Sequence, residues 1–256
     1  METKSGKALH PIGIGTWAVD TSHVDALRYS ILKEQNHIDT AETYGSGEAE
    51  LAVGAVIKPY ERQDLFIASK LWKTSVGEGL ARPAVKAMLE RIGTDYLDML
   101  YIHAPWSDSA WQLAIPQIGE LIDAGLVRYF GVSNFTVADM EETMAISKHP
   151  IAANQLHYSC LYKQDVTEEL AAFCKKHGIA IVAYSPIERK EVMDNFVIKS
   201  IAQNHGATPG QVALAWLLAK GTLPIPKATN RKHILENMES ISLELTPAEM
   251  EQLDRI

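Results

Sequence analysis

The sequence has little cysteine and no long hydrophobic run. Only Cys160 and Cys174 occur among its 256 residues, without CxxC spacing and without a histidine-rich cluster. We therefore expect neither a disulfide framework nor a bound metal, and a reducing cytoplasm is the expected compartment. No run approaches the ~18 apolar residues of a membrane helix, and residues 1–10 have no apolar segment of the signal-peptide kind. No membrane partner is expected.

An excess of positive charge is also missing. Lys and Arg number 24 against 32 Asp and Glu, so the formal net charge is -8. Such a surface repels nucleic acid and anionic membranes, and neither is expected as the main partner. Hydrophobic residues make up 46% and charged residues 22% of the chain, as in ordinary globular proteins. At this length we expect one domain over residues 1–256 and a monomer.

Eight short apolar runs alternate with segments of helical periodicity, for instance Val24, Leu27 and Ile31. Strands separated by helices pair in parallel, and eight of them in about 250 residues favour an α/β protein with a closed (β/α)8 TIM barrel over an open doubly wound sheet. Residues 107–109 are predicted to cap the fourth helix. The runs are Ile12–Gly15, His37–Asp39, Leu65–Ala68, Asp98–Ile102, Val127–Val132, Ile151–Ala153, Ile179–Ala183 and Leu223–Ile225.

A dinucleotide fingerprint of the Rossmann kind is absent. The turn Gly13-Ile14-Gly15 lacks both the third glycine and the acid about 20 residues further on that this fingerprint requires. A nucleotide, if one binds, must be held in another way. The same run offers no His-x-His pair, so a metal-dependent hydrolase on a barrel is not favoured.

Four chemically complementary side chains follow three of the apolar runs. Asp39 ends the second run and Tyr44 comes five residues later, while Lys70 and His103 follow the third and fourth runs. Each residue alone is more often a cap or a turn residue than a catalytic group. Together, a carboxylate, a phenol, an ammonium and an imidazole suit the transfer of a proton. The carboxyl ends of barrel strands are also where active sites lie.

Further polar side chains end the later strands. They are Ser133, Asn134, Asn154, Gln155, Tyr184, Ser185 and Lys227. An amide pair such as Asn134 with Gln155 suits the carboxamide of a nicotinamide, although turn capping explains these residues equally well. Lys227 precedes a helix predicted to begin near residue 230 or 231. An ammonium beside helix N–H groups is typical of an anion site, and a solvated lysine is the alternative.

With these residues in place, the chain resembles the aldo-keto reductases over nearly its whole length. The matching motifs are residues 38–41 with Tyr44-Gly45, residues 68–72, residues 95–98 with 102–103, residues 131–135, residues 154–155, residues 183–186 and residues 225–227. The resemblance implies a barrel that binds NADP(H) without a Rossmann fold and reduces aldehydes and ketones to alcohols by hydride transfer. It also implies a catalytic tetrad of Asp39, Tyr44, Lys70 and His103.

The chemistry of carbonyl reduction agrees with this tetrad. Hydride adds to carbon and negative charge develops on oxygen, so a proton donor must meet that oxygen. Tyr44 is the predicted donor because the Lys70 ammonium stabilises its phenolate, with Asp39 holding Lys70 in place. His103 is predicted to orient the carbonyl oxygen. A non-catalytic scaffold or accessory protein on the same barrel is the alternative function, and the complete tetrad argues against it.

The resemblance also implies the cofactor contacts. The carboxamide is expected on Ser133, Asn134 and Gln155, with the nicotinamide ring stacked on Tyr184. The other expected contacts are Ser185 and Ile187 along the pyrophosphate, Lys227 and His233 at the 2′-phosphate, Glu236 and Asn237 at the adenine, and Thr16 and Trp17 at the end of the first strand.

A small carbonyl compound is the expected substrate. Trp17, Trp72 and Trp106 lie near strand ends and predict a partly aromatic substrate cleft, although each ring could instead belong to the core. The loop at residues 187–192 is short, so a reduced flap over the pyrophosphate is expected. The chain ends at Ile256 just after a predicted helix, so we expect no long C-terminal loop and broad substrate use.

His233 stands where aldo-keto reductases usually have an arginine. Histidine is mostly neutral above pH 6.5, whereas an arginine fork is permanently charged. We therefore expect NADP(H) to be preferred, with Arg231 close enough in sequence to contribute. We expect this preference over NAD(H) to be smaller than an arginine would give, so that NAD(H) is accepted as well.

Overall fold

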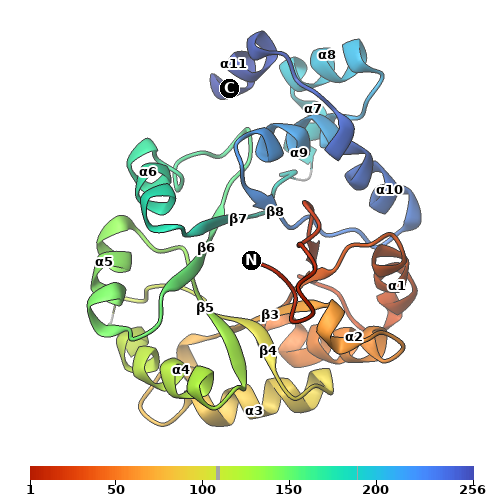
Figure 1. Ribbon diagram of the computed structural model, residues 1–256. Helices are drawn as coiled ribbons and strands as arrows, with labels where there is room; N and C mark the ends of the chain where they lie inside the picture. Colours follow the sequence, from red (N-terminus) through yellow and green to blue (C-terminus); the bar gives the residue numbers. More distant parts are fainter. Residues whose placement is uncertain (108–109, 189) are drawn as a thin grey trace.

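The computed structural model describes residues 1–107, 110–188 and 190–256. Its eight strands pair in parallel and in sequence order (Figure 1). Gly13 N donates to Pro224 O at 2.9 Å and Gly15 N to Pro226 O at 3.1 Å, so the last strand returns to the first and the sheet closes. This confirms the predicted (β/α)8 barrel and not the open sheet. The strands are β1 (Ile14–Gly15), β2 (His37–Asp39), β3 (Phe66–Leu71), β4 (Leu97–Ile102), β5 (Val127–Ser133), β6 (Ile151–His157), β7 (Ala180–Tyr184) and β8 (Leu223–Pro224).

Several strands extend further toward their carboxyl ends than the apolar runs predicted. β3 continues through Lys70, where it pairs with Tyr101 of β4. β6 continues through Gln155, which pairs with Ser133 of β5. The ladder joins backbone groups, so it does not stop where apolar side chains stop. Lys70 and Gln155 are therefore held by the sheet itself rather than by loops.

Helices surround the barrel (Figure 1). They are α1 (Val24–Leu32), α2 (Glu48–Ile57), α3 (Ala81–Ile92), α4 (Ala114–Asp123), α5 (Val137–Ile146), α6 (Glu168–His177), α7 (Lys190–Asp194), α8 (Phe196–His205), α9 (Pro209–Ala219), α10 (Arg231–Glu239) and α11 (Pro247–Asp254). Short 3₁₀ turns lie at residues 21–23, 44–47, 62–64, 73–75, 110–113 and 240–242.

The helix starts follow local sequence chemistry. α9 and α11 each begin with a threonine cap followed by proline, and the capping boxes are Thr208 with Gln211 and Thr246 with Glu249. The predicted cap of the fourth helix, at residues 107–109, lies largely outside the described residues. The predicted loop at 187–192 is partly wrong, because α7 begins within it.

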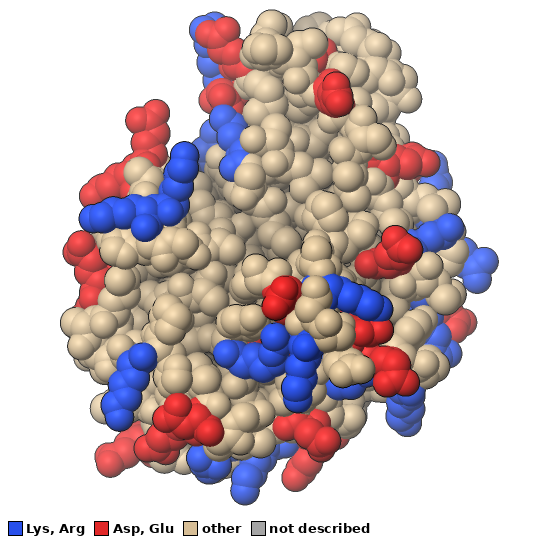
Figure 2. All heavy atoms as spheres, in the orientation of Figure 1, with Lys and Arg blue, Asp and Glu red and all other residues tan. Residues whose placement is uncertain are grey.

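The barrel interior is filled by side chains from alternate strand positions. This inner cluster comprises Phe66, Ala68, Met99, Tyr101, Ala153, Val182 and Ile225. Gly131 makes room for the Tyr101 ring, because a Cβ at residue 131 would lie 2.5 Å from two ring carbons. A bridge between Glu2 and Ala8 folds the amino terminus into a hairpin whose trace crosses the centre of the barrel in Figure 1. In the same view, Figure 2 shows acidic and basic side chains interspersed rather than separated by sign.

A buried charge cluster is built from the amino-terminal part of β4. The Asp98 side chain is fully buried and lies 2.7 Å from Arg62 and 2.6 Å from Arg128. It also accepts the backbone N–H of Ile67 at 2.9 Å. Charged hydrogen bonds from three directions compensate for the desolvation of this carboxylate.

We predict that Asp98→Ala lowers the free energy of unfolding by about 3–5 kcal/mol, because two guanidinium groups and one N–H lose their common acceptor. Asp98→Asn should lose less, since it can still accept from Ile67. Urea unfolding measures both. The exposed Lys7–Asp64 pair is the control, and Lys7→Ala should cost no more than about 1 kcal/mol. Equal losses for Asp98→Ala and Lys7→Ala would contradict a structural role for the cluster.

Candidate active site

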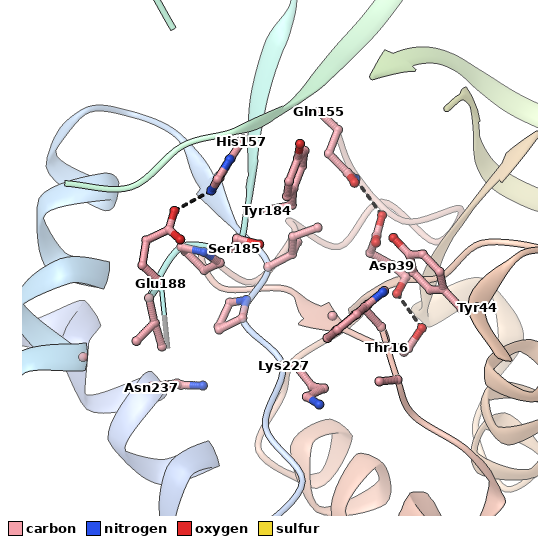
Figure 3. Close-up of a pocket in the computed structure, with 18 of the residues that line it drawn as sticks. Thr16, Asp39, Tyr44, Gln155, His157, Tyr184, Ser185, Glu188, Lys227 and Asn237 are labelled. Atoms are coloured by element: carbon pink, nitrogen blue, oxygen red, sulfur yellow. Dashed lines mark hydrogen bonds and ion pairs between the residues drawn. The ribbon is translucent and has the colours of Figure 1, made fainter. Parts of the chain in front are cut away.

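A cleft of about 1450 Å³ opens at the carboxyl ends of the strands and extends to α10. Its volume exceeds the ~300–1000 Å³ that is typical of small-ligand pockets. All twelve residues predicted to contact the cofactor line it. Figure 3 shows Asp39 and Tyr44 on one side of this cleft and Asn237 on the other.

The Lys70 ammonium organises the deep end of the cleft. Its Nζ lies 2.6 Å from Asp39 Oδ2 and 3.2 Å from the Tyr44 hydroxyl, and it donates to the carbonyl oxygen of Thr40 at 2.8 Å. Three acceptors match the three N–H groups of the ammonium. Lys70 and Asp39 are each 1% exposed, so this is a fully buried ion pair.

Tyr44 reaches the ammonium because the chain turns sharply after β2. Tyr44 N donates to Ala41 O at 3.0 Å. The next three residues have positive φ, namely Gly45 at 58°, Ser46 at 54° and Gly47 at 100°. Left-handed backbone strains a side chain and favours glycine. The glycines that follow Tyr44 therefore let α2 begin directly behind the phenol.

Burial and charge act in opposite directions on this cluster. Burial lowers the pKa of Lys70, but the Asp39 carboxylate and the Tyr44 oxygen outweigh it, so the pKa lies above its ordinary value. Burial raises the pKa of Tyr44, and the Lys70 ammonium opposes this without outweighing it. In the free protein the phenol therefore keeps its proton and the lysine its charge at neutral pH.

His103 completes the predicted tetrad. Its ring centroid lies 4.9 Å from that of Trp72 and 6.1 Å from that of Tyr44, edge-on to both. Burial, together with the Lys70 charge, lowers the pKa of His103 to about 3, so the imidazole is neutral. Its buried Nδ1 has no hydrogen-bond partner among the described residues. The structure thus brings together all four side chains that the sequence predicted.

The predicted nicotinamide-binding amides form a continuous network. Gln155 Nε2 donates to Asp39 Oδ1 at 2.7 Å, as Figure 3 shows. Asn134 Nδ2 donates to His103 O at 3.1 Å, and the Tyr184 hydroxyl donates to Asn134 Oδ1 at 3.0 Å. These contacts tie the cofactor side of the cleft to the tetrad. Binding of a carboxamide here stays a prediction.

At the far end, α10 begins at Arg231 with Asn230 as its cap, close to the predicted start. Lys227 and His233 line the cleft, and Lys227 Nζ lies 5.6 Å from the centre of the Trp17 ring. The Arg231 guanidinium instead lies over the ring of Tyr29 at 5.1 Å and does not line the cleft. The predicted contribution of Arg231 to phosphate binding is not supported.

Two of the three predicted substrate-side tryptophans, Trp17 and Trp72, line the cleft. Trp106 does not line it. Its ring meets Trp72 edge-on at 5.4 Å and so supports that ring from behind. Glu42 holds the same segment, accepting from Trp72 N at 2.5 Å and from the Ser75 hydroxyl at 3.1 Å.

The sequence did not predict several of the residues that line the cleft. They include Thr43, His157, Glu188, Glu191, Met193, Thr208 and Gly210. A signal existed for His157, because it lies two residues beyond Gln155 on β6 and alternate strand residues face the same side. Asn154 lies between them, faces the other way and donates to Phe135 O at 2.8 Å. No comparable pattern marked Glu188.

The cleft fits an extended dinucleotide better than a metal. It joins the half-buried Tyr44 hydroxyl to the first turn of α10, with an aromatic ring at Tyr184 and an ammonium at Lys227 between them. In the described part of the chain, no group of three or more His, Cys, Asp or Glu side chains is placed to hold a metal ion.

Comparison with known proteins agrees with this geometry. The sequence profile of the aldo/keto reductase family matches residues 11–256. The chain belongs to the aldo-keto reductase family. The methylglyoxal reductase YeaE of Escherichia coli is 34% identical, over 97% of this chain and 91% of that relative. A thermostable aldo-keto reductase, crystallised with the inhibitor epalrestat, is 36% identical with a TM-score of 0.92, over 100% of this chain and 98% of its own.

A solved aldo-keto reductase of Klebsiella pneumoniae, bound to NADP and acetate, is 30% identical with a TM-score of 0.89. The match covers 99% of this chain and 93% of that one. This aldo-keto reductase thus shares the barrel over most of the length of both solved structures. Among its described residues, no helix is long and apolar enough to cross a membrane.

We predict that Asp39→Asn lowers the free energy of unfolding at pH 7 by about 3–5 kcal/mol, because the Lys70 ammonium stays buried without a counter-charge. The folded-state pKa of Lys70 is raised above 10.5. The ion pair therefore stabilises the fold below that pH, and the stabilisation disappears as pH rises through the folded-state value.

Urea unfolding at pH 7 and above about pH 10.5 tests this, and the gap between wild type and Asp39→Asn should narrow at the higher pH. The control is the double variant Asp39→Asn/Lys70→Met, which removes both charges and should recover much of the loss. A gap that widens with pH would contradict the assignment.

Proposed function

We propose that this aldo-keto reductase uses NADPH to reduce small reactive aldehydes and ketones to alcohols, with 1,2-dicarbonyls such as methylglyoxal among its substrates. One observation carries the proposal: the buried Lys70 ammonium contacts both the Asp39 carboxylate and the Tyr44 hydroxyl at one end of a cleft sized for a dinucleotide. The similarity to a methylglyoxal reductase and to an NADP-bound structure supports this substrate class and cofactor.

In the proposed mechanism, NADPH when bound supplies a hydride to the carbonyl carbon. Tyr44 donates its proton to the carbonyl oxygen as negative charge develops there. The Lys70 ammonium, 3.2 Å from the Tyr44 oxygen, stabilises the phenolate that is left behind. Asp39 keeps Lys70 charged and in place. His103, neutral because of its low pKa, hydrogen-bonds to the carbonyl oxygen without competing as an acid.

The cofactor contacts are proposed along the same cleft. Ser133, Asn134 and Gln155 would hold the carboxamide, and Tyr184 would stack on the nicotinamide. The remaining proposed contacts are Thr16, Trp17, Ser185, Ile187, Lys227, His233, Glu236 and Asn237, all of which line the cleft. We further propose that residues 1–256 act as one catalytic domain and as a monomer. The two cysteines, free and buried, suit the cytoplasm.

We predict that Tyr44→Phe lowers kcat/KM for methylglyoxal by about 100- to 10,000-fold, because the variant lacks the proton donor. NADPH binding, followed by quenching of protein fluorescence, should change little, since the phenol is not among the proposed cofactor contacts. NADPH oxidation followed by absorbance measures turnover. Undiminished turnover would remove Tyr44 from the mechanism. NADPH binding without turnover of any carbonyl by the wild type would favour the scaffold function.

We predict that His233→Arg raises the preference for NADPH over NADH by about tenfold, because a fixed guanidinium can hold a 2′-phosphate with two charged hydrogen bonds. In the wild type, the preference should grow as pH falls from about 8 to about 6, since histidine gains charge in that range. The arginine variant should show a flatter profile. The ratio of kcat/KM values for the two cofactors measures both effects.

The matched control is Arg231→Ala, which should leave the preference nearly unchanged because Arg231 lies over Tyr29. If the wild-type preference is independent of pH and unchanged in His233→Arg, His233 does not contact the nucleotide and Lys227 decides the preference.

A further inference from the structure

Three nearly parallel rings lie together at the cleft, and two of them, His157 and Tyr184, line it. The His157 ring lies 3.8 Å from that of Tyr162, with an interplanar angle of 16°. It also lies 5.2 Å from the ring of Tyr184, at 13°. His157 therefore backs the ring on which the nicotinamide is expected to stack. A ring that packs face to face on a neighbouring ring loses freedom to move, so the contact with His157 restrains Tyr184.

The same histidine is paired with an acid. His157 Nε2 contacts the Glu188 carboxylate, and Figure 3 shows the two side chains joined across the cleft wall. The Ser159 hydroxyl donates to the same carboxylate at 3.1 Å. Glu188 belongs to the loop after β7, in which Ser185 and Glu188 have positive φ values of 51° and 44°. The pair thus anchors a loop whose backbone is in a costly conformation.

The position of Glu188 poses an electrostatic problem. Glu188 lines the cleft beside Ser185 and Ile187, where the pyrophosphate is expected. Glu191 lines it too. An unpaired carboxylate at this point would repel an anionic cofactor, and like charges in a partly desolvated site interact strongly.

We propose that His157 is a positioning residue that sets cofactor affinity, because its imidazolium neutralises Glu188 beside the pyrophosphate while its ring supports Tyr184. This rests on the proposed function, since it takes the cleft to hold a nicotinamide dinucleotide. His157 touches neither the carbonyl nor the tetrad. It acts through the two residues that it contacts.

The other charged groups near the stack do not replace His157. Tyr162 donates its hydroxyl to Asp165 at 3.3 Å, which brings a second carboxylate to the far side of the stack. The Lys163 ammonium is engaged by the carbonyl oxygens of Cys160 and Ile256. With Glu188 and Glu191 on the loop side, the surroundings of His157 are acidic. Among the side chains that the structure describes, which exclude those of residues 189 and 190, no cation other than His157 contacts Glu188.

The sign of the pH dependence follows from this arrangement. With His157 charged, the pair with Glu188 is neutral; with His157 uncharged, the pair carries one negative charge. Histidine changes charge between pH 5 and 8. The Kd for NADH, which has the pyrophosphate but no 2′-phosphate, should therefore rise by about three- to tenfold from pH 6 to pH 9. An effect of His233 would appear with NADPH alone, so NADH separates the two histidines.

Two substitutions separate the ring from the charge. His157→Phe keeps an aromatic ring in the stack and leaves Glu188 unpaired. It should weaken binding of both cofactors about three- to tenfold at pH 6 and abolish the pH dependence for NADH. The double variant His157→Phe/Glu188→Gln removes both charges and should restore the wild-type Kd. A role limited to packing would not give this rescue.

Quenching of protein fluorescence by NADH and NADPH at pH 6, 7.5 and 9 measures all of these Kd values without turnover. A flat wild-type NADH profile, an unchanged Kd in His157→Phe, or failure of the double variant to recover would overturn the proposal. If a variant does not fold, the pH dependence of the wild-type Kd for NADH tests the proposal by itself. If the Kd values follow this pattern but no carbonyl is reduced, the proposed function is contradicted and the role of His157 in cofactor binding is supported.

Discussion

The contact between the Lys70 ammonium and the Asp39 carboxylate fixes the positions of the side chains at the base of the cleft. Each charge is about 1% exposed, and neither could be buried alone, because desolvation of an isolated ion costs several kcal/mol. The adjacent strands β2 and β3 supply the two side chains, and the 2.6 Å contact between them fixes the spacing at the base of the cleft. Gln155 then fixes the second oxygen of Asp39 at 2.7 Å.

The position of the Tyr44 hydroxyl depends on that contact. The third hydrogen of the ammonium is left for Tyr44, and the glycine-rich turn behind the phenol brings it within 3.2 Å. Burial keeps the phenol protonated, and the ammonium limits the energy of the phenolate once the proton has left. In the proposed reaction, the same two effects would keep Tyr44 protonated beforehand and stabilise its phenolate after proton transfer.

The two ends of the barrel use buried charge for different purposes. At the amino-terminal part of β4, Asp98 is enclosed by Arg62, Arg128 and a backbone N–H, and none of these three side chains lines the cleft. At the carboxyl ends the charges face a cleft. This separation is typical of barrels, in which one end supports the fold and the other carries the chemistry. It allows loops around the site to vary without loss of the frame.

The strand and helix order could be predicted from apolar runs because burial on both faces of a parallel sheet leaves a strong local pattern. The tetrad could be predicted because polar residues at strand ends have few structural explanations when four occur together. The lengths of β3 and β6 could not, since backbone pairing leaves no mark in side-chain polarity. Arg231 was misassigned because closeness in sequence says little about where a helix points its side chains.

His157 was missed for a different reason. Its spacing from Gln155 placed it on the cleft side, but its meaning depends on Glu188, which lies 31 residues away and arrives there only through the loop after β7. Trp106 shows the converse case, since a ring near a strand end can support the cleft without lining it. Contacts between loops that follow different strands depend on how the barrel closes. They leave no pattern in any local stretch of sequence.

We infer that the Lys70 ammonium makes Tyr44 an effective proton donor. The most direct measurement is the single-turnover rate of NADPH oxidation with methylglyoxal in Lys70→Met, at saturating cofactor. Without the ammonium, the pKa of Tyr44 rises further and the phenolate is unsupported. We expect the rate to fall by about 100- to 1000-fold while cofactor affinity changes little. A rate close to that of the wild type would contradict this account.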